Sequence, residues 1–236
     1  MYKVAVAGTG YVGLVAGVCF AEKGQNVVCV DVDETKVEKM KKGISPIYEQ
    51  DLEPMMQKNY KEGRLDFTTD YKKAYKDADF IFIGVGTPER ADGSANLDYV
   101  YEVAKQIAET IEKDCIIVVK STVPIGTNDD VEKYIRDNLV HDVEISVASN
   151  PEFLAQGTAV RDTIYASRIV IGTENKQTEA KMLKLYVAAF EREVALSLVW
   201  QKKTELAEQH LAHAGDIYNE IKSTDRYYIR YLYVGM

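Results

Sequence analysis

The sequence predicts an α/β protein with a doubly wound, mostly parallel sheet, followed by a short helical tail. Apolar runs alternate with helical segments through the first three quarters of the chain. Most of these runs are apolar throughout, which is typical of strands buried on both faces of a sheet. Polar turn residues follow several of them. A repeated β-α-β order implies parallel strands joined by right-handed crossovers.

Composition restricts the class of protein. The chain has 236 residues, of which 46% are hydrophobic, enough for a substantial core. Its net charge of −8 gives no support for a nucleic-acid or membrane partner, and we expect neither. Cys19, Cys29 and Cys115 are odd in number and lack metal-ligand spacing, so we expect no disulfide framework and no metal site. Reduced thiols indicate a cytoplasmic protein.

The order of elements follows from the positions of these runs. The sequence predicts strands in residues 3–8, 27–33, 65–69, 77–88, 115–127, 142–153 and 167–173, several of them running into turns. It predicts helices in residues 13–23, 33–43, 96–113 and 174–190. Residues 44–56 read as a Pro-bearing loop that leads into a further helix. Met1 leads directly into the first strand, so we expect no signal peptide.

A glycine-rich turn follows the first strand and opens the first helix. Gly8 permits a tight turn, Gly10 lets a pyrophosphate approach the backbone, and Gly13 lets the helix lie close to the strand. The helix N-terminus then offers free N–H groups to the phosphates. Asp31 ends the next strand, where a carboxylate accepts hydrogen bonds from a ribose 2′-OH and repels a 2′-phosphate. This Rossmann-like pattern predicts NAD rather than NADP.

Three later strands end in polar clusters. They read "GVGTPERADGSANLDYV", "KSTVPIGT" and "SNPEFLAQG". In an open α/β sheet, ligands bind beyond the carboxyl ends of the strands, so these clusters are candidate site segments. Each one taken alone is also compatible with an ordinary turn, because turns favour the same residue types.

These stretches, with "GTGYVGL", "VDVDETKV", "GISPIYEQDLE" and "SRIVIG", resemble the UDP-glucose/GDP-mannose dehydrogenase family, and within it the UDP-glucose 6-dehydrogenases. The resemblance runs from Met1 to about Gly172 in the family's order. It implies an NAD-dependent double oxidation of UDP-glucose to UDP-glucuronate, in nucleotide-sugar metabolism and polysaccharide biosynthesis. A family cysteine would hold the intermediate as a thiohemiacetal and then as a thioester.

The resemblance also implies roles for particular residues. Asp31 and Lys36 would contact the adenosine ribose, and Thr87 and Thr122 would lie near the nicotinamide. Glu152 would assist thioester hydrolysis, which makes Glu152 and Thr122 the candidate catalytic residues. The implied cofactor-binding set is Gly8, Gly10, Tyr11, Val12, Gly13, Asp31, Lys36, Thr87, Thr122 and Gln156, and the implied substrate-binding set is Glu152, Phe153, Leu154, Ala155 and Gln156. Gln156 stands where relatives often carry a glutamate that touches the cofactor.

The resemblance ends before the last part of the chain. We expect an NAD-binding domain at residues 1–190 and a divergent helical tail at residues 191–236, in place of the family's central helix and second domain. The family's lysine–asparagine motif and cysteine segment have no match, and no cysteine follows Cys115. A truncation, a frameshift or a degenerate paralogue would give such a sequence, and we expect little or no turnover by this chain alone. A homodimer is possible but uncertain without the central helix.

Two other functions stay open. The chain could be a non-catalytic NAD-binding module, because the nucleophile of the second oxidation has no counterpart here. It could also belong to a related dehydrogenase that acts on GDP-mannose or a UDP-N-acetyl sugar. Near the C-terminus, His210 and His213 stand three residues apart on a predicted helix, a spacing that could bind a metal ion. No third ligand is placed near them, so we expect two surface histidines.

Overall fold

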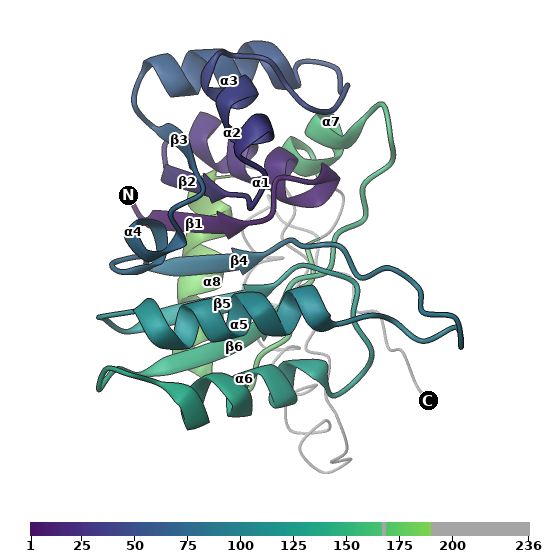
Figure 1. Cartoon of the computed structure of the whole chain (residues 1–236). Helices are drawn as coiled ribbons and strands as arrows, with labels where there is room; N and C mark the ends of the chain where they lie inside the picture. The colour runs from purple at the N-terminus through teal and green to yellow at the C-terminus, as the bar shows by residue number, and fades with distance from the viewer. Residues whose placement is uncertain (167–168, 190–236) are drawn as a thin grey trace, which may run out of the picture.

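A computed structural model of the chain describes residues 1–166 and 169–189. Its centre is a parallel sheet of six strands in the order β3-β2-β1-β4-β5-β6 (Figure 1). The strands are β1 (Lys3–Ala7), β2 (Asn26–Val30), β3 (Leu65–Thr68), β4 (Phe80–Ile83), β5 (Cys115–Val119) and β6 (Ile145–Ser149). The order reverses at β1, where the chain crosses from β3 to β4. This confirms the predicted doubly wound parallel sheet.

Alternate residues of each strand enter two separate cores. In β1, Val4 and Val6 lie in one hydrophobic cluster, whereas Ala5 and Ala7 lie in the other. The register continues this division across the sheet, since Val6 is opposite Cys29 of β2 and Phe82 of β4. Both faces are therefore covered, which explains why the strands are apolar throughout.

Helices cover both faces of the sheet. They are α1 (Tyr11–Glu22), α2 (Glu34–Lys41), α3 (Leu52–Lys61), α4 (Tyr71–Tyr75), α5 (Asp98–Thr110), α6 (Thr127–Asn138), α7 (Ala159–Ile164) and α8 (Lys176–Ala189). The helices α4, α5 and α6 bury their apolar residues on one face, while α1, α2, α3, α7 and α8 contribute to the core of the other. In Figure 1, α5 and α6 lie in front of the sheet and α8 lies behind it.

The predicted helices and the first six predicted strands are present, but the predicted strand at residues 167–173 is wrong. Ile169, Val170 and Ile171 are buried, yet the segment pairs with β6 only through an antiparallel bridge between Gly172 and Ser149. Its apolar residues cover the core instead of extending the sheet, and an apolar run alone does not distinguish these two arrangements. The sequence analysis also did not anticipate α4, α6 and α7.

The predictions for the tail lie outside the described residues. These include the helix through His210 and His213, the boundary at residue 190 and any contact that would form a dimer. The division into domains at 1–190 and 191–236 stays a prediction. Within residues 1–166 and 169–189, none of the helices has both the length and the apolar content needed to cross a bilayer.

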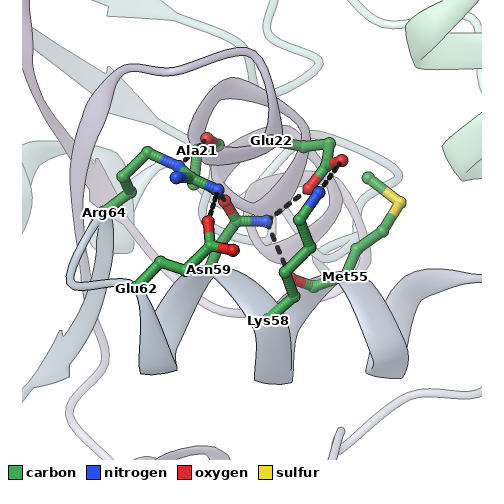
Figure 2. A network of polar contacts seen from close by, with 7 residues as sticks. All are labelled: Ala21, Glu22, Met55, Lys58, Asn59, Glu62 and Arg64. Carbon is green, nitrogen blue, oxygen red and sulfur yellow. Dashed lines mark hydrogen bonds and ion pairs between the residues drawn. The ribbon is translucent and has the colours of Figure 1, made fainter.

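A buried polar cluster joins the C-terminal end of α1 to α3 and to the start of β3 (Figure 2). Its centre is Asn59, which has no exposed surface. The Asn59 amide nitrogen donates to Glu22 Oε2 at 2.7 Å and to the Met55 carbonyl at 2.8 Å. The Asn59 Oδ1 accepts from Arg64 Nη2 at 2.7 Å and from Nε at 2.9 Å. Asn59 therefore satisfies an acidic and a basic side chain at once, and fixes α3 against α1.

Replacing Asn59 should cost far more stability than replacing an exposed member of this cluster. We expect Asn59→Leu to lower the free energy of unfolding by about 3 kcal/mol, because Glu22 and Arg64 would lose buried partners. Lys58 pairs with Glu22 at 2.7 Å but its side chain is 50% exposed, so Lys58→Met should cost under about 1 kcal/mol. Urea unfolding of both variants checks this, and equal losses would contradict the central role of Asn59.

Candidate functional site

The turn between β1 and α1 is held by close approach of backbone atoms. Gly8 has φ +92°, and a Cβ atom there would lie 2.9 Å from the Gly84 carbonyl oxygen. A Cβ atom on Gly13 would lie 2.0 Å from the Gly8 carbonyl oxygen, and one on Gly84 would lie 3.0 Å from the Gly13 Cα. Only glycine fits at Gly8 and Gly13, so the roles predicted for these two residues agree with the geometry.

Gly10 differs from the other two glycines of the turn because the space beside its Cα is open. A Cβ atom at Gly10 would meet no other atom within 4 Å. Gly10 caps α1, and no side chain completes the cap with a hydrogen bond. The first N–H groups of a helix lack intrahelical partners and carry the positive end of its dipole. The open face and uncapped N–H groups fit a phosphate, so the residues present suit a dinucleotide pyrophosphate.

Asp31 follows β2 and faces the glycine turn. Its Oδ2 accepts hydrogen bonds from the Thr9 amide, at 3.0 Å, and from the Thr9 hydroxyl, and its Oδ1 accepts from the Asp33 amide at 3.0 Å. Burial raises the pKa of the Asp31 carboxyl, but hydrogen bonds from Thr9 and Asp33 and the charge of Lys36 bring it below its ordinary value. Asp31 is therefore a carboxylate at neutral pH, with lone pairs left for a further donor.

Lys36 lies beside this carboxylate. Its Nζ is 3.9 Å from Asp31 Oδ2, and its side chain is 44% exposed. The amide of Lys36 donates to the Asp33 side chain, which caps the start of α2. Lys36 is thus neither a distant surface lysine nor a buried partner, and its ammonium group can reach a ligand at the end of β2.

The polar clusters after β4, β5 and β6 come together because these strands are neighbours in the sheet. Thr87 Oγ1 donates to the Thr122 carbonyl at 2.8 Å, which ties the loop after β4 to the loop after β5. Ser121 Oγ donates to the Val85 carbonyl at 2.6 Å and strengthens the same junction. At this edge of the sheet Thr122 is exposed and Thr87 is half-buried, and doubly wound sheets bind ligands there.

The loop after β6 carries Glu152 and Gln156. Glu152 Oε2 accepts from the Leu154 amide at 2.6 Å, so the carboxylate closes a local turn instead of capping a helix. Phe153 and Gln156 are exposed. The structure places this loop at the same edge of the sheet as Thr87 and Thr122, and it does not test what Glu152 or Gln156 binds.

A cavity of about 190 Å³ lies behind this loop. Its polar lining includes Lys120, Asn150, Glu152, Asp162 and Tyr186. Lys120 Nζ donates to Asn150 Oδ1 at 3.1 Å, and the Tyr186 hydroxyl donates to the same oxygen. Burial lowers the pKa of Lys120 to about 8, against a smaller opposite effect of the Glu152 charge. A largely buried amine therefore lies beside the loop that carries the candidate catalytic glutamate.

The sequence analysis missed Thr9, Glu49 and Lys120 as parts of this region. Thr9 occupies an unspecified position of the glycine motif, and only the fold brings its hydroxyl to Asp31. Glu49 lies in a stretch that resembles the family, but its sequence neighbours do not reveal its distant partners. Lys120 begins the polar cluster "KSTVPIGT" after an apolar strand, but the sequence analysis gave it no role.

All three cysteines are buried and unpaired in disulfides. Burial raises the pKa of each thiol to about 12. Cys19, Cys29 and Cys115 therefore act as small hydrophobic residues of the core. Among residues 1–166 and 169–189, no group of three or more His, Cys, Asp or Glu side chains could hold a metal ion.

Comparison with known proteins identifies relatives of the whole described region. Residues 2–190 match the model of the UDP-glucose/GDP-mannose dehydrogenase family, NAD binding domain. A UDP-glucose 6-dehydrogenase of Bacillus subtilis is 50% identical over 184 residues, which cover 78% of this chain and 42% of that protein. One from Rhizobium meliloti is 43% identical over 225 residues, which cover 94% of this chain and 50% of that protein. The chain thus spans about half the length of these relatives.

Solved structures show the same fold. A UDP-glucose dehydrogenase from Pyrobaculum islandicum has a TM-score of 0.76 and 39% identity, covering 80% of this chain and 44% of that one. A GDP-mannose dehydrogenase from Pseudomonas aeruginosa, solved as a ternary complex, has a TM-score of 0.75 and 33% identity. That match covers 94% of this chain and 51% of the other.

Two glycines of the turn should respond differently to the same substitution. We expect Gly13→Ala to lower the free energy of unfolding by about 3 kcal/mol or more, because the new methyl group would overlap the Gly8 carbonyl. Gly10→Ala should change stability by less than about 0.5 kcal/mol, yet weaken NAD binding about tenfold or more, since its methyl group enters the proposed phosphate space. Urea unfolding and calorimetric titration with NAD measure the two effects. Unchanged NAD affinity in Gly10→Ala would contradict this placement.

Lys120 should give the protein a distinct dependence of stability on pH. Its pKa is about 8 in the folded protein and 10.5 ordinarily, so between these values the unfolded chain binds more protons and stability rises with pH. The unfolding free energy of the wild type should therefore rise relative to Lys120→Met by about 2 kcal/mol from pH 7 to pH 10. Urea unfolding of both proteins across this range makes the comparison. A constant difference would show that Lys120 titrates normally.

Proposed function

The chain belongs to the UDP-glucose/GDP-mannose dehydrogenase family, and we propose that it binds NAD and takes part in the oxidation of UDP-glucose to UDP-glucuronate. One observation carries the proposal. The open face of Gly10 at the start of α1 and the Asp31 carboxylate at the end of β2 border the same turn, which suits the pyrophosphate and ribose of a dinucleotide. Bound NAD would supply the hydride acceptor.

The residues of this chain would then bind the dinucleotide and the sugar nucleotide and orient them. The amides at the start of α1, from Tyr11 to Gly13, would hold the pyrophosphate, and Asp31 with Lys36 would hold the adenosine ribose. Thr87 and Thr122, linked through a 2.8 Å hydrogen bond, would border the nicotinamide. Glu152 would keep one carboxylate oxygen for a proton or a water molecule, because the other accepts from Leu154. Phe153 to Gln156 would border the sugar nucleotide.

The charge at the end of β2 supports NAD over NADP. Asp31 holds its negative charge at neutral pH because hydrogen bonds and Lys36 lower its pKa. The 2′-phosphate of NADP would face this carboxylate, and the repulsion between the two charges would weaken the binding of NADP. Lys36 lies on the exposed side and offsets only part of that repulsion.

Two other functions remain to be separated from this one by experiment. The chain could bind NAD without oxidising a sugar nucleotide, since no cysteine follows Cys115 in its sequence. It could also act on GDP-mannose, which the Pseudomonas aeruginosa relative supports by its name. The B. subtilis and R. meliloti relatives, named UDP-glucose 6-dehydrogenases, support UDP-glucose. We further propose a cytoplasmic location, which the three buried thiols support, and a homodimer is left to direct measurement.

Two measurements on the purified chain test the proposal. The shift of the unfolding temperature with NAD, and separately with NADP, reports dinucleotide binding. We expect a larger shift with NAD. The formation of NADH from NAD with UDP-glucose or GDP-mannose reports the oxidation and the preferred sugar nucleotide.

The outcomes separate the candidate functions. NADH formed with UDP-glucose supports the proposed dehydrogenase and contradicts the expectation of little turnover by the chain alone. A shift with NAD but no NADH supports an NAD-binding module. No shift with NAD would overturn the cofactor site itself.

A further inference from the structure

Glu49 joins three parts of the protein that lie far apart in the sequence. It lies between α2 and α3, and the residue is only 6% exposed. Its Oε1 accepts from the Tyr11 hydroxyl at 2.5 Å and from the Gly157 amide at 2.6 Å. Its Oε2 accepts from the Ala159 amide at 3.0 Å. One carboxylate therefore connects the start of α1 with the end of the loop at residues 151–158.

The partners of Glu49 lie at or just before the starts of α1 and α7. Tyr11 is the first residue of α1 and follows Gly10 directly, at the proposed pyrophosphate position. Gly157 has φ +91°, a conformation that favours glycine, and its amide is aimed at Glu49. Ala159 begins α7. The Glu49 carboxylate thus bridges the glycine turn and the loop at residues 151–158, and Glu49 lies outside both segments.

The Tyr11 hydroxyl strengthens this bridge. Its oxygen lies 2.5 Å from Glu49 Oε1 and 2.9 Å from the Ala155 carbonyl oxygen. A hydroxyl has one proton to donate, so it can serve only one of these acceptors at a time. Asp162 holds the loop from the other side, where its Oδ2 accepts from the Ala155 amide at 3.1 Å and from the Thr158 hydroxyl at 2.8 Å.

The charge of Glu49 is maintained by its surroundings. Burial raises the pKa of its carboxyl, but hydrogen bonds from Tyr11, Gly157 and Ala159 outweigh this effect, so the pKa lies below its ordinary value. The carboxylate form suits this position, because in the structure all three of its partners donate hydrogen. An amide at this position would present its own N–H groups to at least one of these donors.

We propose that Glu49 is a positioning residue that couples dinucleotide binding at the glycine turn to the conformation of residues 151–158. The coupling rests on the proposed NAD site. Phosphates that fix the first turn of α1 would also fix the Tyr11 side chain, and through Glu49 they would favour the ordered form of the loop. Coupling between two sites is reciprocal, so an ordered loop would raise the affinity for NAD by the same factor.

Hydrogen exchange measures this coupling without requiring catalysis. The full chain is exposed to deuterium with and without saturating NAD, and uptake is followed by mass spectrometry in peptides that cover residues 151–159. We expect NAD to slow exchange in this segment about tenfold in the wild type, toward the lower end of the usual range for coupling between two sites. The NAD dissociation constant is measured in parallel by calorimetric titration.

Two variants separate coupling from simple support of the fold. Tyr11→Phe removes the hydroxyl but keeps the Tyr11 amide and both bonds from Glu49 to the Gly157 and Ala159 amides. We expect exchange without NAD to stay close to that of the wild type, while most of the slowing by NAD disappears. Glu49→Gln should speed exchange without NAD and also abolish the slowing. In both variants the NAD dissociation constant should rise, by up to about tenfold.

Glu53→Gln is the matched control, at a carboxylate in the first turn of α3, four residues after Glu49. Glu53 Oε2 accepts from the Ser45 amide at 2.8 Å and is exposed. We expect this variant to keep the full slowing by NAD and an unchanged dissociation constant.

Several results would overturn the inference. Full slowing by NAD in Tyr11→Phe would show that Glu49 supports the loop without coupling it to the cofactor turn. NAD that binds the wild type but leaves exchange in residues 151–159 unchanged would also overturn it. Absence of NAD binding to the wild type would overturn the proposed cofactor site, and the coupling with it, and is distinguishable by the titration.

Discussion

The close packing of backbone around Gly8, Gly13 and Gly84 is the constraint on which the rest of the structure depends. It brings the start of α1 against the ends of β1 and β4, where a Cβ atom on Gly8 or Gly13 would overlap a carbonyl oxygen and one on Gly84 would crowd a Cα. Because α1 is seated this closely, its free N–H groups face the point where the strand order reverses. The position of Asp31 is then set through its hydrogen bonds to Thr9, which lies inside the same turn.

An acidic protein can hold an anionic ligand when the positive potential is local. The net charge of −8 gives no general attraction for a dinucleotide. The uncapped start of α1 supplies oriented N–H groups instead, and these do not depend on side-chain charge. Hydrogen bonds stabilise the charge of a carboxylate at the turn, as Thr9 and Asp33 do for Asp31. The remaining lone pairs of Asp31 stay available to hydroxyl groups of a ligand.

The loop after β6 shows how carboxylates can hold an irregular segment. Glu49 accepts from backbone amides at its end, and Asp162 accepts from Ala155 and Thr158 within it. Charged acceptors make stronger hydrogen bonds than neutral ones. Two carboxylates can therefore order a segment that lacks the regular backbone hydrogen bonds of a helix or a strand. Lys120 and Asn150 support the same loop from the cavity behind it. The loop that carries the candidate residue Glu152 is therefore held by side chains that lie outside it.

The sequence by itself determined the order of the six strands, the glycine turn and the acid at the end of β2. These depend on local periodicity and on residue types at fixed spacing, which the chain carries without reference to its fold. The family was indicated separately, by the resemblance of whole motifs. Only the tertiary structure decided that residues 169–172 bridge β6 instead of forming a strand, that Thr9 holds Asp31 and that Glu49 reaches the amides of Gly157 and Ala159. Such contacts join residues up to 110 positions apart, and no local pattern records them because they arise when separate segments pack on one sheet.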